Sequence, residues 1–179
     1  MKNSIKVMLI IAVAFVASCS STQSLQEYYV DSAENPNFIS LDVPTSILNL
    51  ADADLSEGQR AALSSLRKLN VLAFRITSEN EAEYKIENAK VKEILKNDYF
   101  VELMKLNSSY GKGVIKYLGD EDAIDEVIIY GNSKEKGFAL VRVLGKDMNP
   151  AHIVQLIQAL QKSDYKGEGL GEIGNFLKG

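Results

Sequence analysis

The sequence contains very little cysteine, histidine, proline or tryptophan. Its 179 residues include one cysteine, one histidine, three prolines and no tryptophan. A single cysteine excludes an internal disulfide and leaves any paired-cysteine metal or redox motif incomplete. The fold must therefore be stabilised by its hydrophobic core, and a chain of about 150 residues can bury roughly two thirds of its unfolded surface. Without an internal repeat or a proline-rich linker, we expect one folded domain.

Long basic runs are also missing. The chain has 20 basic and 24 acidic residues, and no run of Lys or Arg is longer than a pair. If residues 1–18 are removed, Lys2 and Lys6 are lost and the formal charge becomes 18 − 24 = −6. Nucleic acid and anionic lipid headgroups are therefore poor candidate partners.

One continuous apolar run lies close to the N-terminus, at residues 7–17 (VMLIIAVAFVA), after Lys2 and Lys6. A helix of this length rises about 16 Å, which is half of the ~30 Å hydrocarbon core of a bilayer. The run is too short to span a membrane, and its flanks are those of a signal peptide. We predict a signal peptide over residues 1–18.

The only cysteine follows this run directly. Val16-Ala17-Ser18-Cys19 resembles the bacterial lipobox, in which an aliphatic residue and two small residues precede a cysteine. A thiolate is nucleophilic enough to form the thioether to a diacylglycerol. Ordinary secretion with cleavage after Ser18 is the alternative, and a free thiol or an intermolecular disulfide would leave the position of Cys19 unexplained. We predict lipidation at Cys19, which would anchor the protein to the membrane.

The predicted organisation of the remaining chain has three parts. Residues 19–35 (CSSTQSLQEYYVDSAEN) read as a polar tether in which Leu25, Tyr28, Tyr29 and Val30 could form a short docking helix. Residues 36–162 form a single domain. Residues 163–179 carry five of the twelve glycines, which disfavours both helix and strand. Leu170, Ile173, Phe176 and Leu177 recur there at helical spacing, as in a partner-binding segment, but we expect a loosely packed tail.

Periodicity and turn residues predict the fold of the domain. A strand is expected at residues 38–43 (FISLDV), one or two helical turns at 46–50, a helix over 57–66 capped by Ser56 and Gln59, and a strand at 70–77 (NVLAFRIT). A second capping box, Ser78 with Glu81, opens a helix to about residue 96. Apolar runs at 99–106, 113–118, 123–130 and 137–144 predict an antiparallel meander. Asn149 and Pro150 begin a last helix.

This order of elements predicts an α+β fold: a mostly antiparallel sheet of about five to six strands with helices packed on one face. The other face of the sheet is expected to be partly in contact with water.

Few residues suggest chemistry. His152, the only histidine, lies near a helix N-terminus, where a neutral imidazole is favoured, but the sequence assigns it no nucleophile, and we interpret it as a helix-surface residue. The acidic run at residues 120–126 (DEDAIDE) and the shorter run at 52–54 lack the glycine and the distal glutamate of a calcium-binding loop. We expect a solvated hairpin turn at 120–126. We predict no catalytic residue, no metal site and no cofactor.

Two arginines lie inside predicted strands. Arg75 and Arg142 must each face solvent or meet an anion there. We expect them to pair with acidic residues of the fold rather than to bind a phosphate or carboxylate ligand.

From the tether to Leu160, the chain resembles a family of small exported lipoproteins, common in Bacteroidota, called domain of unknown function 4252. The resemblance is carried by the lipobox ending at Cys19, FISLDV, LNVLAFRITSEN before the long charged helix, NDYFVELMKLN and GFALVRVLGKDMNPAHIVQLIQAL. It brings no catalytic signature. Members are often encoded near regulators of envelope-type sigma factors, which implies a signalling or stress role by association.

These observations lead to three functional hypotheses. The first is a lipid-anchored cell-envelope protein without enzymatic activity, which binds a partner protein or an envelope component through its sheet face or its glycine-rich tail. The second is a regulatory sensor of an envelope signalling system, and the third is a periplasmic enzyme. SSTQS after Cys19 lacks the acidic residues of a surface-export signal. We therefore expect an outer-membrane anchor that faces the periplasm.

Overall fold

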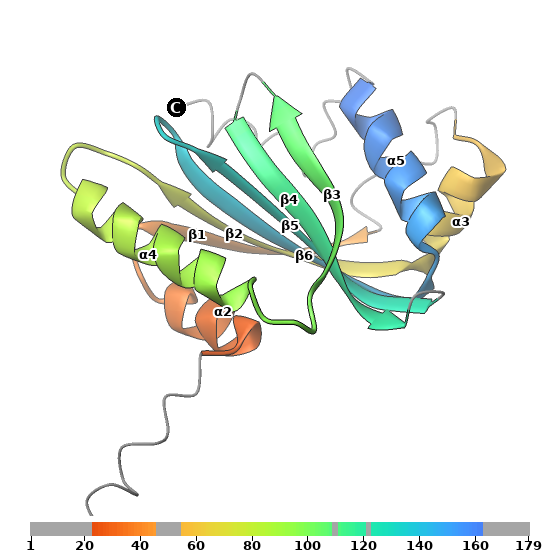
Figure 1. Ribbon diagram of the computed structural model, residues 1–179, viewed down its shortest axis with the longest axis horizontal. Helices are drawn as coiled ribbons and strands as arrows, with labels where there is room; N and C mark the ends of the chain where they lie inside the picture. The colour runs from red at the N-terminus through yellow and green to blue at the C-terminus, as the bar shows by residue number, and fades with distance from the viewer. Residues whose placement is uncertain (1–22, 46–54, 109–110, 121–122, 163–179) are drawn as a thin grey trace, which may run out of the picture.

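The computed structural model describes residues 23–45, 55–108, 111–120 and 123–162 (Figure 1). The described ranges contain four helices and six strands. In chain order these are α2 Leu25–Ala33, β1 Phe38–Pro44, α3 Glu57–Ser65, β2 Leu66–Arg75, α4 Glu81–Ile94, β3 Val101–Ser108, β4 Gly111–Asp120, β5 Ala123–Ser133, β6 Gly137–Met148 and α5 Pro150–Lys162. The short helix expected at residues 46–50 and the tail at 163–179 lie outside the described residues.

The strands form one open antiparallel sheet in the order β1-β2-β6-β5-β4-β3. The last four strands are the predicted meander, and β1 and β2 continue the sheet beyond β6. The α+β fold is confirmed. Strand β2 begins four residues earlier than expected, because Leu66, the C-cap of α3, already has extended backbone (φ −77°, ψ 145°). The strand therefore starts where the helix ends.

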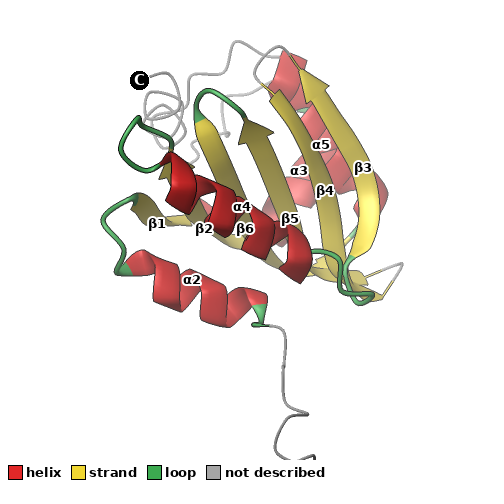
Figure 2. Cartoon of the chain, turned by 60° about the vertical axis from the view of Figure 1, so that its left-hand side comes forward, coloured by secondary structure: helices red, strands yellow, loops and turns green. Residues whose placement is uncertain are grey.

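The helices divide between the two faces of the sheet, whereas the sequence pattern led us to expect them on one. Figure 2 shows α2 and α4 in front of the sheet and α3 and α5 behind it. The reason is that β2 is apolar on both sides: Leu72 and Phe74 belong to the core under α2 and α4, and Leu69 belongs to the core under α3 and α5. A strand with two apolar faces needs cover on both.

Helix α2 belongs to the folded domain. Ser24 and Glu27 form a capping box at its start. Leu25, Tyr28 and Tyr29 are buried against the sheet, whereas Val30, which we expected to dock with them, points to solvent and is 60% exposed. The docking helix considered for residues 19–35 therefore exists, and the folded domain begins before residue 36.

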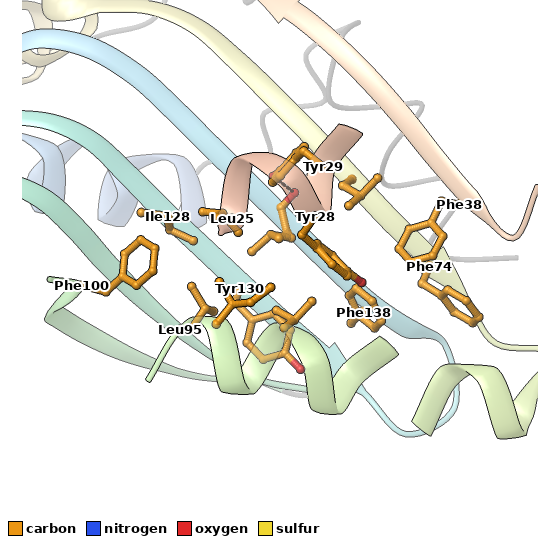
Figure 3. Close-up of a cluster of buried hydrophobic side chains, with 14 of the residues drawn as sticks. Leu25, Tyr28, Tyr29, Phe38, Phe74, Leu95, Phe100, Ile128, Tyr130 and Phe138 are labelled. Carbon is orange, nitrogen blue, oxygen red and sulfur yellow. Dashed lines mark hydrogen bonds between the residues drawn. The ribbon is translucent and has the colours of Figure 1, made fainter. Parts of the chain in front are cut away.

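The core between the sheet and helices α2 and α4 is rich in aromatic rings (Figure 3). Phe38 meets Phe74 edge to face with their centroids 5.0 Å apart, and Phe74 stacks on Phe138 at 5.7 Å. Such pairs contribute roughly 0.5–1.5 kcal/mol beyond their buried area. The cluster joins β1, β2 and β6 beneath the two helices.

The start of α4 differs from the predicted capping box. Its N-cap is Asn80, which makes no side-chain cap. The Asn80 side chain instead accepts a hydrogen bond from the Thr77 backbone N–H (2.8 Å) and donates one to the Arg75 carbonyl (3.0 Å). Asparagine readily binds nearby backbone groups in this way, and here it forms the turn between β2 and α4.

Candidate interaction surface

The predicted lipidation site, Cys19, lies outside the described residues. The described chain starts at Gln23, and α2 begins at Leu25, close behind Cys19 in sequence. Within the described ranges, no helix is long and apolar enough to cross a bilayer.

His152 lies where α5 contacts α3. Its backbone N–H donates a hydrogen bond to the Asn149 side chain (3.2 Å), which confirms the predicted cap. Its partly exposed ring lies beside Gly58 of α3, because a Cβ built on Gly58 would be 3.2 Å from His152 Cδ2. The two helices approach so closely here that a side chain at position 58 would have little room. His152 lies in this contact between helices, in agreement with a structural role.

The acidic run at residues 120–126 spans the β4–β5 hairpin. Glu121 and Asp122 lie outside the described residues, whereas Glu126 points to Arg142 of the adjacent strand β6. In the part of the chain that the structure describes, no group of three or more His, Cys, Asp or Glu side chains could hold a metal ion.

The predicted ion pairing is found at Arg142. Its Nε and Nη2 donate to the two carboxylate oxygens of Glu126 at 2.6 and 2.8 Å, and the two side chains are only 12% and 14% exposed. The hydrogen bonds to Glu126 raise the pKa of Arg142, although burial acts in the opposite direction. Arg75, in contrast, is exposed at the end of β2.

Helix α2 is joined to this ion pair by two side chains. Gln26 accepts a hydrogen bond from Arg142 Nη1, and the Arg142 guanidinium lies over the Tyr29 ring, 5.4 Å from its centroid. The Tyr29 hydroxyl donates to the Leu140 carbonyl at 2.7 Å. Burial raises the pKa of Tyr29 well above its usual value. Helix α2, the first helix of the described chain, is therefore attached to the centre of the sheet by directional contacts.

A second polar network lies under α4. The Tyr130 hydroxyl donates to Asn88 (2.8 Å), and the Asn88 and Asn132 amides donate to the Tyr84 hydroxyl (3.0 and 2.8 Å). Asn88, which interrupts the apolar face of this helix in the sequence, is thus buried with its amide hydrogen-bonded. Because these groups bind one another in the core, we interpret the network as structural.

The opposite face of the sheet is covered over only part of its area. Helices α3 and α5 lie on this side, and Ile153 and Leu156 of α5 pack with a buried row of residues that crosses five strands. This row contains Val43, Leu69, Val143, Val127 and Tyr117, which the strand register places side by side.

The next two rows of the same face contain many partly exposed residues. Strand pairing aligns Leu41, Val71, Val141, Ile129, Ile115 and Met104 in one row and Ile39, Ala73, Ala139, Gly131, Gly113 and Leu106 in the other. Val71, Ala73 and Ile115 are buried, and the other nine are partly exposed. Five of these nine also pack in part against the core under α3 and α5: Leu41, Met104, Leu106, Ile129 and Val141. We call these nine residues the open strip: Ile39, Leu41, Met104, Leu106, Gly113, Ile129, Gly131, Ala139 and Val141.

The open strip has a low centre. Ala139, Gly131 and Gly113 follow one another across three adjacent strands. Among the described residues, a Cβ built on Gly131 meets no atom within 4 Å, whereas a Cβ on Gly113 would lie 2.4 Å from the Tyr130 carbonyl oxygen. None of the nine residues is charged. The sequence led us to expect a sheet face partly in contact with water but did not identify these residues, because they come from five strands and become neighbours only through their register.

Comparison with known protein families shows which family the domain resembles. The model of a family described as Domain of unknown function (DUF4252) matches residues 28–156, which runs from α2 into α5 and includes the whole sheet. No curated protein and no solved structure matches the chain.

Proposed function

This chain belongs to the DUF4252 family, and we propose that it is a lipid-anchored protein of the bacterial cell envelope that binds a partner, without enzymatic activity, through the open strip of its sheet. The observation that carries the binding role is the open strip itself. Its uncharged residues come from five strands and keep partial exposure on one face of the sheet, and apolar surface that stays accessible to solvent is where proteins bind partners.

The distance between the proposed anchor and the domain supports this proposal. Only residues 20–24 separate Cys19 from the first residue of α2. Even a fully extended chain of this length spans about 20 Å. Since α2 is attached to the sheet through Tyr29 and Arg142, a lipid on Cys19 would hold the whole domain close to the membrane surface. The partner would then be a protein or other component of the envelope that faces the periplasm.

The chemistry of the open strip indicates the kind of partner. Aliphatic side chains flank the low centre, and the strip has no charged group that could bind a phosphate or a carboxylate. Such a surface fits an apolar segment of a protein better than a polar small molecule, because burial of apolar area would supply the binding free energy.

One experiment tests both halves of the proposal. Wild type, Cys19→Ser and Gly131→Glu are each produced in the native host, and the cells are separated into membrane and soluble fractions. The protein is detected in each fraction, and it is studied by intact mass and by native electrophoresis after detergent extraction of the membranes. We expect wild type to begin at Cys19, to carry diacylglycerol and an acyl chain, and to migrate as a complex. Cys19→Ser should leave the membrane fraction.

Gly131→Glu is the matched variant for partner binding. Its side chain enters open space, so the fold should persist while a charge is placed on the apolar strip. We expect it to remain lipidated and to migrate as the free protein. A wild-type chain without a lipid, or cleaved elsewhere, would overturn the anchor. A complex that survives Gly131→Glu would overturn the binding surface and leave the anchor in place.

A further inference from the structure

The open strip lies directly beside α5. Ile153 and Leu156 of α5 cover the adjoining row of the same sheet face, and this helix ends at Lys162. Residues 163–179 follow it in the chain (SDYKGEGLGEIGNFLKG). The open strip and the end of the described chain therefore lie on the same side of the sheet.

The length of this C-terminal segment is sufficient to cross the strip. Seventeen residues reach up to about 55 Å when extended. Six strands spaced about 4.8 Å apart span about 24 Å, so the segment can cross the sheet even if it is far from fully extended.

The composition of the segment matches the strip. Leu170, Ile173, Phe176 and Leu177 supply large apolar side chains, and the glycines between them carry no side chain to obstruct a close approach. The strip offers a matching shape at Gly131, where a Cβ would meet no described atom within 4 Å, beside the small residue Ala139 of the neighbouring strand. Large side chains over small ones are how packed surfaces interdigitate.

We propose that residues 163–179 dock on the open strip of their own chain, with Phe176 and Leu177 among the side chains that cover its low centre. The inference goes beyond the proposed function and requires neither the lipid nor a partner. Where the strip also binds a partner, the C-terminal segment competes with that partner for the same apolar surface.

The absence of tryptophan from the sequence provides a clean test. The unlipidated chain, with residues 1–18 removed and Cys19→Ser, is given a single tryptophan by Ile129→Trp on the strip. The control is Ile86→Trp on α4, a position that is 56% exposed and belongs to a helix on the opposite face of the sheet. Each tryptophan is studied with the native C-terminal segment and with Ile173→Ser, Phe176→Ser and Leu177→Ser combined. Acrylamide quenching and the emission wavelength are measured.

We expect the serine substitutions to increase quenching of the tryptophan at position 129 severalfold and to shift its emission to the red, without a change at position 86. In a chain that ends at Lys162, a synthetic peptide of residues 163–179 should restore protection. Val141→Trp repeats the test if Ile129→Trp does not fold, as judged by circular dichroism.

Equal quenching at position 129 with both C-terminal segments would overturn the inference, because the strip would then be open in the full chain. Protection that disappears on dilution, together with a dimer in analytical ultracentrifugation, would assign the docked segment to a second copy and overturn docking within one chain. Neither result bears on the lipid or on the complex from membranes, so failure here is distinguishable from failure of the proposed function.

Discussion

At the scale of the residue, the most informative side chain is Arg142. It binds Glu126 through two hydrogen bonds, contacts the Tyr29 ring and donates to Gln26, so one guanidinium joins β5, β6 and α2. From the sequence we expected Arg142 to pair with an acidic residue, but the sequence did not indicate which one. Glu126 lies sixteen residues away in the chain and becomes its neighbour only through the β5–β6 register.

Removing one partner of this ion pair should lower the stability of the protein. Arg142→Ala leaves Glu126 as a nearly buried charge without its partner, and we expect the free energy of unfolding to fall by about 3 kcal/mol, the lower end of the range for buried pairs. Each side chain keeps some exposure, which is why we expect the lower value. Urea unfolding of Arg142→Ala, Glu126→Ala and the double variant forms a double-mutant cycle.

The matched control replaces both charges at once. Arg142→Met with Glu126→Leu removes the ion pair but keeps apolar volume, and it should stay within about 1 kcal/mol of wild type. A double-mutant cycle with no coupling between positions 126 and 142 would show that the pair contributes nothing to stability.

At the scale of the element, two glycines in the same row of the sheet have different roles. Gly113 of β4 lies so close to β5 that a Cβ would meet the Tyr130 carbonyl at 2.4 Å, whereas a Cβ on Gly131 of β5 meets no atom of the described chain within 4 Å. The first glycine allows two strands to approach. The second leaves open space on the surface, and no rule of local sequence distinguishes the two.

Alanine substitution should separate these roles. Gly113→Ala forces a backbone shift, and we expect it to lower the free energy of unfolding by about 2 kcal/mol. Gly131→Ala should be neutral or stabilising by about 0.5–1 kcal/mol, because glycine inside a strand has excess freedom in the unfolded chain. Thermal unfolding of both variants measures the difference, and equal effects would contradict the assignment.

At the scale of the whole molecule, α2 and α4 enclose a core that contains several tyrosine hydroxyl groups. Burial raises the pKa of Tyr28, Tyr29 and Tyr130 above the usual value for tyrosine. The folded protein therefore keeps these protons to higher pH than the unfolded chain does. Their contribution to stability is fully present below pH ~10 and is lost as pH rises above it.

Alkaline titration should show this coupling. We expect part of the tyrosinate absorbance to appear only together with the loss of native circular dichroism, above pH ~10. Tyr29→Phe should reduce that late phase by one tyrosine and weaken the dependence of stability on pH in this range. Complete ionisation of all eight tyrosines in a protein that is still folded would contradict the prediction.

The whole fold also shows which elements could be predicted from local sequence patterns. The strands of the meander, the Ser56 capping box and the Asn149 cap were all predictable, because each depends on residues a few positions apart. The capping box predicted at Ser78 is wrong, since α4 begins after Asn80, whose side chain bonds the Thr77 N–H and the Arg75 carbonyl instead. The division of the helices between two faces depends on how much apolar surface each side of β2 exposes, and periodicity alone does not measure it.

By itself, the sequence determined the α+β class, the order of the elements and the single cysteine on which the proposed lipid anchor rests, because all of these are local or compositional properties. Only the tertiary structure decided which side chains meet across strands: Glu126 with Arg142, Tyr29 with the Leu140 carbonyl, and the nine residues of the open strip. The physical reason is register. A shift of one residue in strand pairing moves every side chain to the other face, and tertiary packing, rather than local periodicity, selects among the possible pairings.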